Sequence, residues 1–598
     1  MKRFLLLSLL SGTILFAFAS GPLKKAYSHK QKDGTTITVY KCGDGFTGYY
    51  ATLDGVTLLQ KEDGDYYYAS FNEKGEIDIT DNLAHNAAFR SEAEKLTVRE
   101  LATSVVNTEK ALMKKSKRPT SAALNNDGTG TYGVSAPGTV GSIGHVVMPF
   151  VMVSFPDREF LETTTKEKVT RLFNEEGYAD EPNCKGSVSD YFKSQSHNMF
   201  TPEFVVVDQV TVSQGYAHYG KNSGSSKDAL YLEFVREVVD SVMSHGINLD
   251  NFIVAKDGYA NRIPMIGIYY AGPGEHSSYE DGSENYLWAK YGSLSYTNKY
   301  RFQSFIMCNE TFQDYVADGN GNPVWAGPGK TDGIGVTCHE FSHALGLPDF
   351  YKTSSGVQTY CTMEYWSVMD YGQYWKNSYA PIGYNAYERN FMGWLKYQDL
   401  DPTEAQLVNL YNFDAENDTM ALRIVNPDNS SEYFILENRQ VGTWYPADLG
   451  TGILLTRVDY LYTAWNANSL NNNSSHPRFE FVPADGVKQS KTLGGKNIDF
   501  RGDLYPGTTN VTGIESFKFY TGRVLTTPLI NITEENQTIH FSFIQDLTGI
   551  DAALSDNNKK LEIIERYSLD GRRISNLNLH KGALIEKLSD GSSRIVVK

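Results

Sequence analysis

The sequence is poor in cysteine, in basic charge and in long apolar runs, and each shortage disfavours a class of protein. Five of its 598 residues are cysteines, and none has C-x-x-C spacing, so a structural zinc knuckle is not expected. Aspartate and glutamate (71) outnumber lysine and arginine (55), and the net charge of -16 disfavours a nucleic-acid partner. No segment after Ser20 is apolar enough to cross a bilayer, so we expect no transmembrane span in the mature chain.

Residues 1–19 have the pattern of a signal peptide. Lys2 and Arg3 precede a short apolar run that ends at the small-residue site Ala17-Phe18-Ala19. A membrane anchor is the alternative, but the run is short for a span of about 20 residues. We therefore expect an exported protein, secreted or held at the surface, where disulfides are permitted. Four cysteines downstream of Cys42 could pair, with buried free thiols as the alternative: Cys184, Cys308, Cys338 and Cys361.

The length exceeds what one hydrophobic core supports, so several domains are expected. Tyrosine-rich, strand-like runs fill residues 30–90, helical spacing follows over 91–113, and a basic, then Gly- and Ser-rich stretch is typical of an exposed, easily cut linker. Helical and strand-like stretches then alternate, before strands predominate. We predict a signal peptide (1–19), a β-rich propeptide and linker (20–137), an α/β (α+β) catalytic domain (138–400), a β-sandwich-like domain (401–546) and a strand-rich tail (547–598).

The stretch HEFSHALGLPD, residues 339–349, carries the chemistry. His339 and His343 are four residues apart, so on a helix they lie on one face and can direct two imidazole nitrogens at one zinc ion. Glu340 can then act as general base towards a metal-activated water. An ordinary helix that happens to carry two histidines is the alternative, and the residues that follow the motif argue against it.

Gly346 can end the helix in a left-handed conformation, and Asp349 follows as a third ligand, as in the extended metzincin motif. Glu364 is a rival third ligand, because it lies about twenty residues after the second histidine, as in thermolysin-like enzymes. Downstream, WSVMDYG matches a methionine turn. Met369 would form an apolar floor below the metal, and Tyr371 is a candidate catalytic residue that would donate a hydrogen bond to the oxyanion, or one that only packs.

These segments resemble the immune inhibitor A family of secreted bacterial metallopeptidases. The likeness includes HEFSHALGLPDFY and WSVMDYG, but also VSFPDREF upstream and YFILENRQ, GTGILLTRVDY and GDLYPG downstream. It extends over most of residues 28–546, including a propeptide-like N-terminal part. The resemblance implies a metzincin-like catalytic domain, zinc bound by His339, His343 and Asp349, and Glu340 as the base.

Further features implied by resemblance concern calcium and secretion. Calcium sites are common in such proteases, and DYVADGNGNP, with Asp314, Asp318 and Asn320, is either a calcium loop or a plain turn. The last residues, from YSLDGRRIS to RIVVK, resemble sorting tails of the type IX secretion route of some Gram-negative bacteria, with a small β-module as the alternative. The tail could thus contact secretion machinery.

The expected function is a zinc endopeptidase that acts on proteins or peptides and is made as a zymogen. Latency could involve Cys42 or Asp44 in KCGDGF as a metal-blocking ligand, or these residues could belong to an ordinary strand and turn. A surface binding or adhesion protein with an inactive protease-like domain is the alternative function, although the intact Glu340 argues against it. A zinc hydrolase that acts on another bond also remains open.

Overall fold

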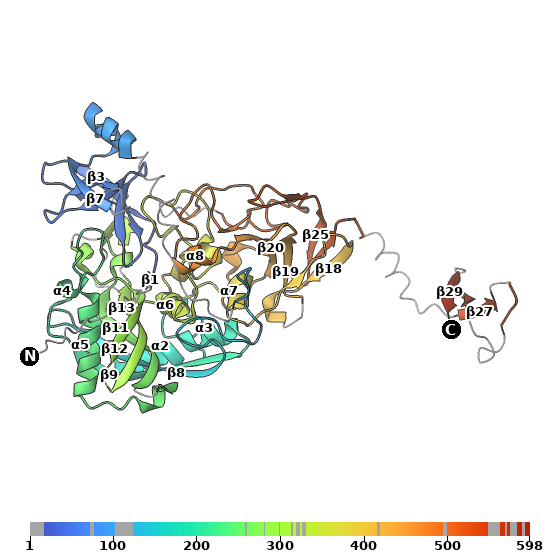
Figure 1. The fold of residues 1–598 in the computed structure, drawn as a ribbon, viewed down its shortest axis with the longest axis horizontal. Helices are drawn as coiled ribbons and strands as arrows, with labels where there is room; N and C mark the ends of the chain where they lie inside the picture. Colours follow the sequence, from blue (N-terminus) through green and yellow to red (C-terminus); the bar gives the residue numbers. More distant parts are fainter. Residues whose placement is uncertain are drawn as a thin grey trace, which may run out of the picture.

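The computed structural model describes residues 17–597 apart from 72–76, 102–123, 258–259, 280–281, 298, 313–314, 318–322, 326–329, 416–418, 494–498, 548–562, 569–570, 575–582 and 589–592. Within them, four β-rich parts follow one another along the chain (Figure 1). Short 3-10 helices connect several elements: η1 (Ala87–Phe89), η2 (Asp250–Phe252), η3 (Glu275–Ser277), η4 (Ser283–Asn285), η5 (Glu364–Trp366), η6 (Tyr371–Tyr374), η7 (Phe413–Ala415) and η8 (Ala447–Leu449).

The N-terminal part is a six-stranded antiparallel sheet in sequential order. Successive side chains on a strand point to opposite faces, so Tyr66 and Tyr68 are buried with Tyr50 in one small core while Tyr67 between them is not. Residues 92–101 are helical, as predicted, and the rest of the predicted helix lies outside the described residues. The strands are β2 (Ala26–Lys30), β3 (Thr36–Gly43), β4 (Gly48–Thr52), β5 (Thr57–Gln60), β6 (Tyr66–Phe71) and β7 (Ile77–Leu83).

The second part is built on a mixed sheet of order β1-β12-β13-β11-β8-β9. Strands β13, β11, β8 and β9 run parallel, while β12 is antiparallel to β13 and β1 is antiparallel to β12. The strands are β1 (Ala17–Ala19), β8 (Gly144–Ser154), β9 (Phe200–Thr211), β10 (Ala255–Asp257), β11 (Ala260–Pro273), β12 (Lys290–Thr297), β13 (Tyr300–Phe312), β14 (Tyr315–Ala317), β15 (Pro323–Trp325) and β16 (Lys330–Thr331).

Helices cover both faces of this sheet, which explains the continuous apolar run in β8. Phe150 and Met152 face the core shared with α2, α3 and α6, while Val151 and Val153 face the core shared with α5. The helices are α2 (Lys166–Asn174), α3 (Val188–Gln195), α4 (Tyr216–Gly220), α5 (Tyr231–Ser244), α6 (Gly335–Leu345) and α7 (Ala386–Phe391).

The third part contains two sheets, of order β17-β19-β20-β21-β22 and β18-β26-β25, that share a core. A predicted boundary at residue 400 falls just inside it, because β17 (Gln398–Asp399) already pairs with β19. The remaining elements are β18 (Gln406–Leu410), β19 (Ala421–Asn426), β20 (Asn429–Arg439), β21 (Gly452–Asp459), α8 (Tyr462–Asn466), β22 (Phe479–Phe481), β23 (Phe517–Lys518), β24 (Val524–Leu525), β25 (Leu529–Glu535) and β26 (Thr538–Phe543). One large core joins this part to the second, so α6 and β21 contribute to the same cluster.

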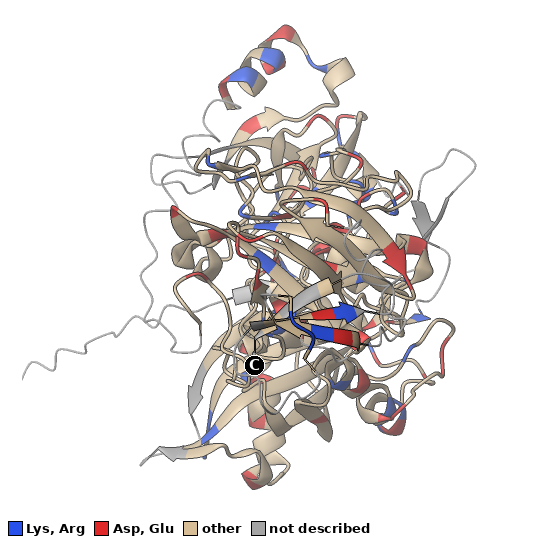
Figure 2. Cartoon of the chain, turned by 90° about the vertical axis from the view of Figure 1, so that its right-hand side faces the viewer, with Lys and Arg blue, Asp and Glu red and all other residues tan. Residues whose placement is uncertain are grey.

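The tail forms a three-stranded antiparallel sheet, β27 (Ile563–Ser568), β28 (Ala583–Leu588) and β29 (Ser593–Val597). Acidic and basic residues lie side by side on it near the C-terminus (Figure 2), for example Arg566 Nε at 2.8 Å from Glu586 Oε1. The sheet agrees with the strand-rich tail that the sequence predicts, and its sorting role stays a prediction.

Two local expectations have a different outcome from the one favoured by composition. The linker composition predicted an exposed segment, but residues 124–137 run against the second and third parts, where Gly130 N donates to Asn390 Oδ1 at 2.6 Å. All five cysteines are free thiols, so the alternative of buried or partly buried thiols describes the structure. Among the described residues, no helix has both the length and the apolar character needed to cross a bilayer.

Candidate active site

Helix α6 carries the motif, and each of its residues is buried. It ends at Gly346, whose backbone has φ 112° and whose N–H donates to His343 O at 2.9 Å. A side chain here would be strained, and a Cβ would lie 2.9 Å from Gly138 N. The predicted glycine C-cap is thus confirmed, and it turns the chain so that Asp349 returns towards the helix.

The two motif histidines direct the same ring nitrogen at one point. His339 Nδ1 lies 2.8 Å from Val368 O, and His343 Nδ1 lies 2.7 Å from Leu347 O. A carbonyl only accepts, so each Nδ1 carries the hydrogen and each Nε2 keeps its lone pair. The two Nε2 atoms are 3.1 Å apart. With each Nδ1 hydrogen used by a carbonyl, both Nε2 atoms are placed to bind one cation.

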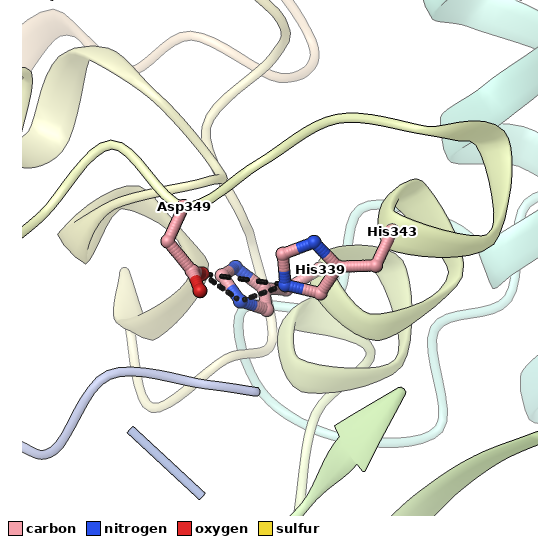
Figure 3. A group of neighbouring side chains, drawn as sticks. All are labelled: His339, His343 and Asp349. Carbon is pink, nitrogen blue, oxygen red and sulfur yellow. Dashed lines mark hydrogen bonds and ion pairs between the residues drawn. The ribbon is translucent and has the colours of Figure 1, made fainter. Parts of the chain in front are cut away.

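Asp349 completes the cluster (Figure 3). Its Oδ1 lies 3.1 Å from His339 Nε2 and 3.3 Å from His343 Nε2, and this buried oxygen has no hydrogen-bond partner. Its Oδ2 accepts a 2.5 Å hydrogen bond from Asn468 Nδ2, while Asp349 N donates to Asn468 Oδ1 at 2.8 Å. Burial alone would raise the pKa of Asp349, but the two histidines outweigh it and lower the pKa to about 2.

This donor set fits a divalent metal. Of the described residues, His339, His343 and Asp349 are the one group of histidine, cysteine, aspartate or glutamate side chains whose ligand atoms could share an ion. Two neutral imidazoles and one carboxylate, with outer hydrogen bonds that fix each orientation, are typical of zinc. The structure brings Asp349 to the histidines, whereas Glu364 Oε2 accepts from Thr492 N at 2.9 Å and lies outside the cluster.

Glu340 lies beside the cluster and is fully buried. Its Oε1 accepts from Ser20 N at 2.7 Å and from Ser20 Oγ at 2.6 Å, while its buried Oε2 has no hydrogen-bond partner. Burial raises the pKa of Glu340, and His339 and His343 oppose that shift. A carboxyl in such a position suits a group that accepts and returns a proton.

The segment predicted as a methionine turn contacts the motif at two points. Met369 is buried, its O accepts from Phe350 N at 2.8 Å, and its neighbour Val368 supplies the carbonyl that fixes His339. The catalytic role of Tyr371 stays a prediction, beside the alternative that it only packs. Its ring packs against Tyr365 and Tyr374, and it contributes to a small hydrophobic cluster.

The two predicted blocking residues are also placed. Cys42 Sγ lies 4.0 Å from Tyr40 O, and Asp44 Oδ1 accepts from Phe46 N and Thr47 N in a turn, so both belong to the strand-and-turn alternative. The candidate calcium ligands Asp314, Asp318 and Asn320 lie outside the described residues.

Sequence reasoning missed three residues at the site: Ser20 of the bound peptide segment, and two residues that contact this segment. Ser20 binds Glu340 from a position 320 residues away, and Trp288 and Tyr351 contact the same segment. Tyr351 lies only two residues after Asp349, in PDFY, so the sequence alone could have indicated that it lies near the predicted metal ligands. The contact between Ser20 and Glu340 left no such signal.

A histidine–histidine–aspartate cluster beside a buried glutamate is typical of a metal-dependent hydrolase. Residues 303–396, which contain the motif and the methionine turn, match the family model described as immune inhibitor A peptidase M6, catalytic domain.

Two curated relatives agree with that match. Pre-pro-metalloprotease PrtV of Vibrio cholerae serotype O1 (strain M66-2) is 26% identical over 259 residues, which are 39% of this chain and 27% of that protein. Immune inhibitor A of Bacillus thuringiensis subsp. alesti is 24% identical over 264 residues, 40% of this chain and 36% of that protein. The matched stretch thus spans about a quarter to a third of these relatives' length. The matches support a metallopeptidase domain of the immune inhibitor A type.

Proposed function

We propose that this protein is an exported zinc endopeptidase that hydrolyses proteins or peptides and is made as a zymogen. The observation that carries the proposal is the arrangement of Glu340 next to the His339, His343 and Asp349 cluster, with a peptide segment of the chain itself lying against that glutamate. The name of one relative, a pre-pro-metalloprotease, and the peptidase description of the matching family model support the same reaction class.

The residues divide the chemistry between them. His339, His343 and Asp349 would hold zinc, which when bound supplies a Lewis acid and lowers the pKa of a water molecule towards about 7. Glu340 takes a proton from the attacking water and returns it to the nitrogen of the leaving amine. Burial of Glu340 disfavours its charged form, and this makes the protonated state that the second step needs easier to reach.

The peptide bond is the substrate that the geometry favours over other hydrolysable bonds. Ser20 places a backbone nitrogen 2.7 Å from Glu340 Oε1, which is close enough for a protonated Glu340 to pass its proton to a leaving nitrogen at this position. The alternative, an inactive adhesion protein, has no use for a carboxylate held between a ligand cluster and a peptide.

The first prediction concerns metal dependence. The full chain, activated by limited trypsin digestion and loaded with zinc, is expected to cleave a denatured protein, and a chelator is expected to abolish cleavage until zinc is added back. The measurement is release of peptides identified by mass spectrometry. Absence of zinc-dependent cleavage in protein that holds one zinc per chain would support the adhesion alternative.

Latency would follow from the position of the N-terminal part. The six-stranded sheet docks on the second part through buried contacts: Lys41 Nζ donates to Ser278 O at 2.7 Å and to Glu275 O at 3.1 Å. Backbone hydrogen bonds add to them, including Gly48 N to Ser225 O at 2.8 Å. The docked sheet holds the preceding segment, with Ser20, against Glu340, where it would exclude a substrate.

The second prediction tests this latency. Lys41→Ala removes charged hydrogen bonds of the docked sheet, each worth about 1.5–3 kcal/mol, so the activity before trypsin treatment is expected to rise at least about 10-fold. Lys61→Ala is the matched control. The ion pair of Lys61 is with the exposed Asp81, which lies in the same N-terminal part and not across the docking contact. After trypsin treatment both variants should equal the unsubstituted enzyme. Equal activities before treatment would argue against an inhibitory docked sheet.

Export and sorting belong to the same proposal. A signal peptide at residues 1–19 would direct export, and the β27–β28–β29 tail would contact secretion machinery. The names of the relatives are consistent with an exported protease.

A further inference from the structure

The segment around Ser20 is bound along the site by its main chain. Strand β1 pairs antiparallel with β12, so that Ala19 lies opposite Lys290. The next three carbonyl oxygens in turn each accept a hydrogen bond from one side chain: Ala19 O from the Tyr351 hydroxyl, Ser20 O from Trp288 Nε1 (2.7 Å) and Gly21 O from the Tyr374 hydroxyl (2.5 Å). Because these contacts are made to main-chain atoms, they recognise an extended backbone and not particular side chains.

One peptide bond in this segment lies between two functional groups. The nitrogen of the Ala19–Ser20 bond donates to Glu340 Oε1 at 2.7 Å, and the oxygen of the same bond accepts from the Tyr351 hydroxyl. Hydrolysis of an amide needs a proton at the nitrogen and stabilisation of negative charge at the oxygen. The Ala19–Ser20 bond is also the one that removal of the proposed signal peptide would break, so these contacts show how the site of the full-length chain holds a peptide bond.

We propose that Tyr351 is a catalytic residue, which donates a hydrogen bond to the carbonyl oxygen of the scissile bond. This inference rests on the proposed peptidase function. Water attacks the carbonyl carbon and a C–O bond forms, while the π electron pair moves onto the oxygen that Tyr351 binds. Glu340 holds the proton lost by the water. When the pair returns to the carbon, the C–N bond breaks, and Glu340 delivers its proton to the departing nitrogen.

The environment of Tyr351 agrees with this role. Its ring is 4% exposed, and a Cβ on Gly21 would lie 3.0 Å from the ring, so the ring packs directly on the bound segment. The acceptor of its hydroxyl is Ala19 of the proposed signal peptide, so removal of that peptide would free the hydroxyl for a substrate carbonyl. The ring of Tyr371, by contrast, packs among Tyr365 and Tyr374.

The test compares Tyr351→Phe with Tyr374→Phe, each made as the full chain, loaded with zinc and activated by trypsin. Loss of one donor to the oxyanion costs about 10²–10³-fold in kcat, and Tyr351→Phe is expected to show this fall with little change in KM. Tyr374→Phe removes the same hydroxyl from a contact two carbonyls further along, and is expected to change mainly KM. Zinc content and Tm are measured for both.

The outcomes separate this inference from the proposed function. If the unsubstituted enzyme cleaves peptides and zinc-loaded Tyr351→Phe has the same kcat, the role of Tyr351 is refuted while the peptidase function stands. If the unsubstituted enzyme is inactive, the peptidase function itself is refuted. Should Tyr351→Phe not fold, a crystal structure of the activated enzyme with a phosphinic peptide decides: a phosphinyl oxygen bound by the Tyr351 hydroxyl supports the role, and one bound elsewhere overturns it.

Discussion

Replacing Glu340 with glutamine is expected to lower kcat by about 10⁴-fold while zinc stays bound, the upper end of what a positioned acid–base group contributes. The amide has nearly the same shape as the carboxyl, and its oxygen can still accept from the Ser20 backbone N–H, so the fold should not change. It cannot take a proton from water or return one to the amine. Because Glu340 is not among the three clustered ligands, metal content should be unaffected.

The measurement is steady-state cleavage of a peptide by the trypsin-activated protein, together with zinc per chain and Tm. Glu203→Gln is the control. It makes the same chemical change at an exposed position on β9 of the mixed sheet in the second part. Its activity should equal that of the unsubstituted enzyme. A Glu340→Gln enzyme that retained a substantial part of its activity would remove the general base from the mechanism.

The ligand cluster could be predicted because its determinants are local. Two histidines one turn apart, a glycine that must adopt positive φ and an aspartate just beyond it lie in one short stretch, so helix geometry fixes their positions. The alternation of strands and helices likewise indicated an α/β pattern, and the tyrosine-rich runs indicated strands in the N-terminal part.

The contacts that control access to the site could not be predicted from local sequence. Ser20 meets Glu340 through the pairing of β1 with β12, and Asn468 fixes Asp349 from the third part. Such contacts depend on how separate cores dock, which no periodicity encodes.

Composition also gave the wrong impression of the stretch before the catalytic domain. Gly130 and Gly138 read as linker glycines, yet a Cβ would lie 1.7 Å from Asn390 O at the first and 2.1 Å from Ala344 O at the second. These glycines permit close backbone approach in a packed segment, a role that composition cannot distinguish from flexibility.

Replacing Asp349 with alanine is expected to release the metal and with it all cleavage. Only the two histidines would then remain of three protein ligands, and the Asn468 amide would lose its acceptor. Zinc affinity should fall by more than the roughly 10–100-fold that loss of an outer hydrogen-bond partner costs. Titration with a zinc-competing chelator measures this, with Tm showing whether the chain stays folded.

Two further variants show whether the loss of zinc is specific to Asp349. Asn468→Ala leaves all three ligands but removes the hydrogen bond to Asp349 Oδ2, so zinc affinity should fall by about 10–100-fold. Glu364→Gln tests the rival ligand and keeps an oxygen for Thr492 N, so zinc binding should be unchanged. The reverse order, with zinc retained by Asp349→Ala and lost by Glu364→Gln, would transfer the third ligand to Glu364. It would also contradict the convergence of Asp349 Oδ1 on both Nε2 atoms, on which the zinc site depends.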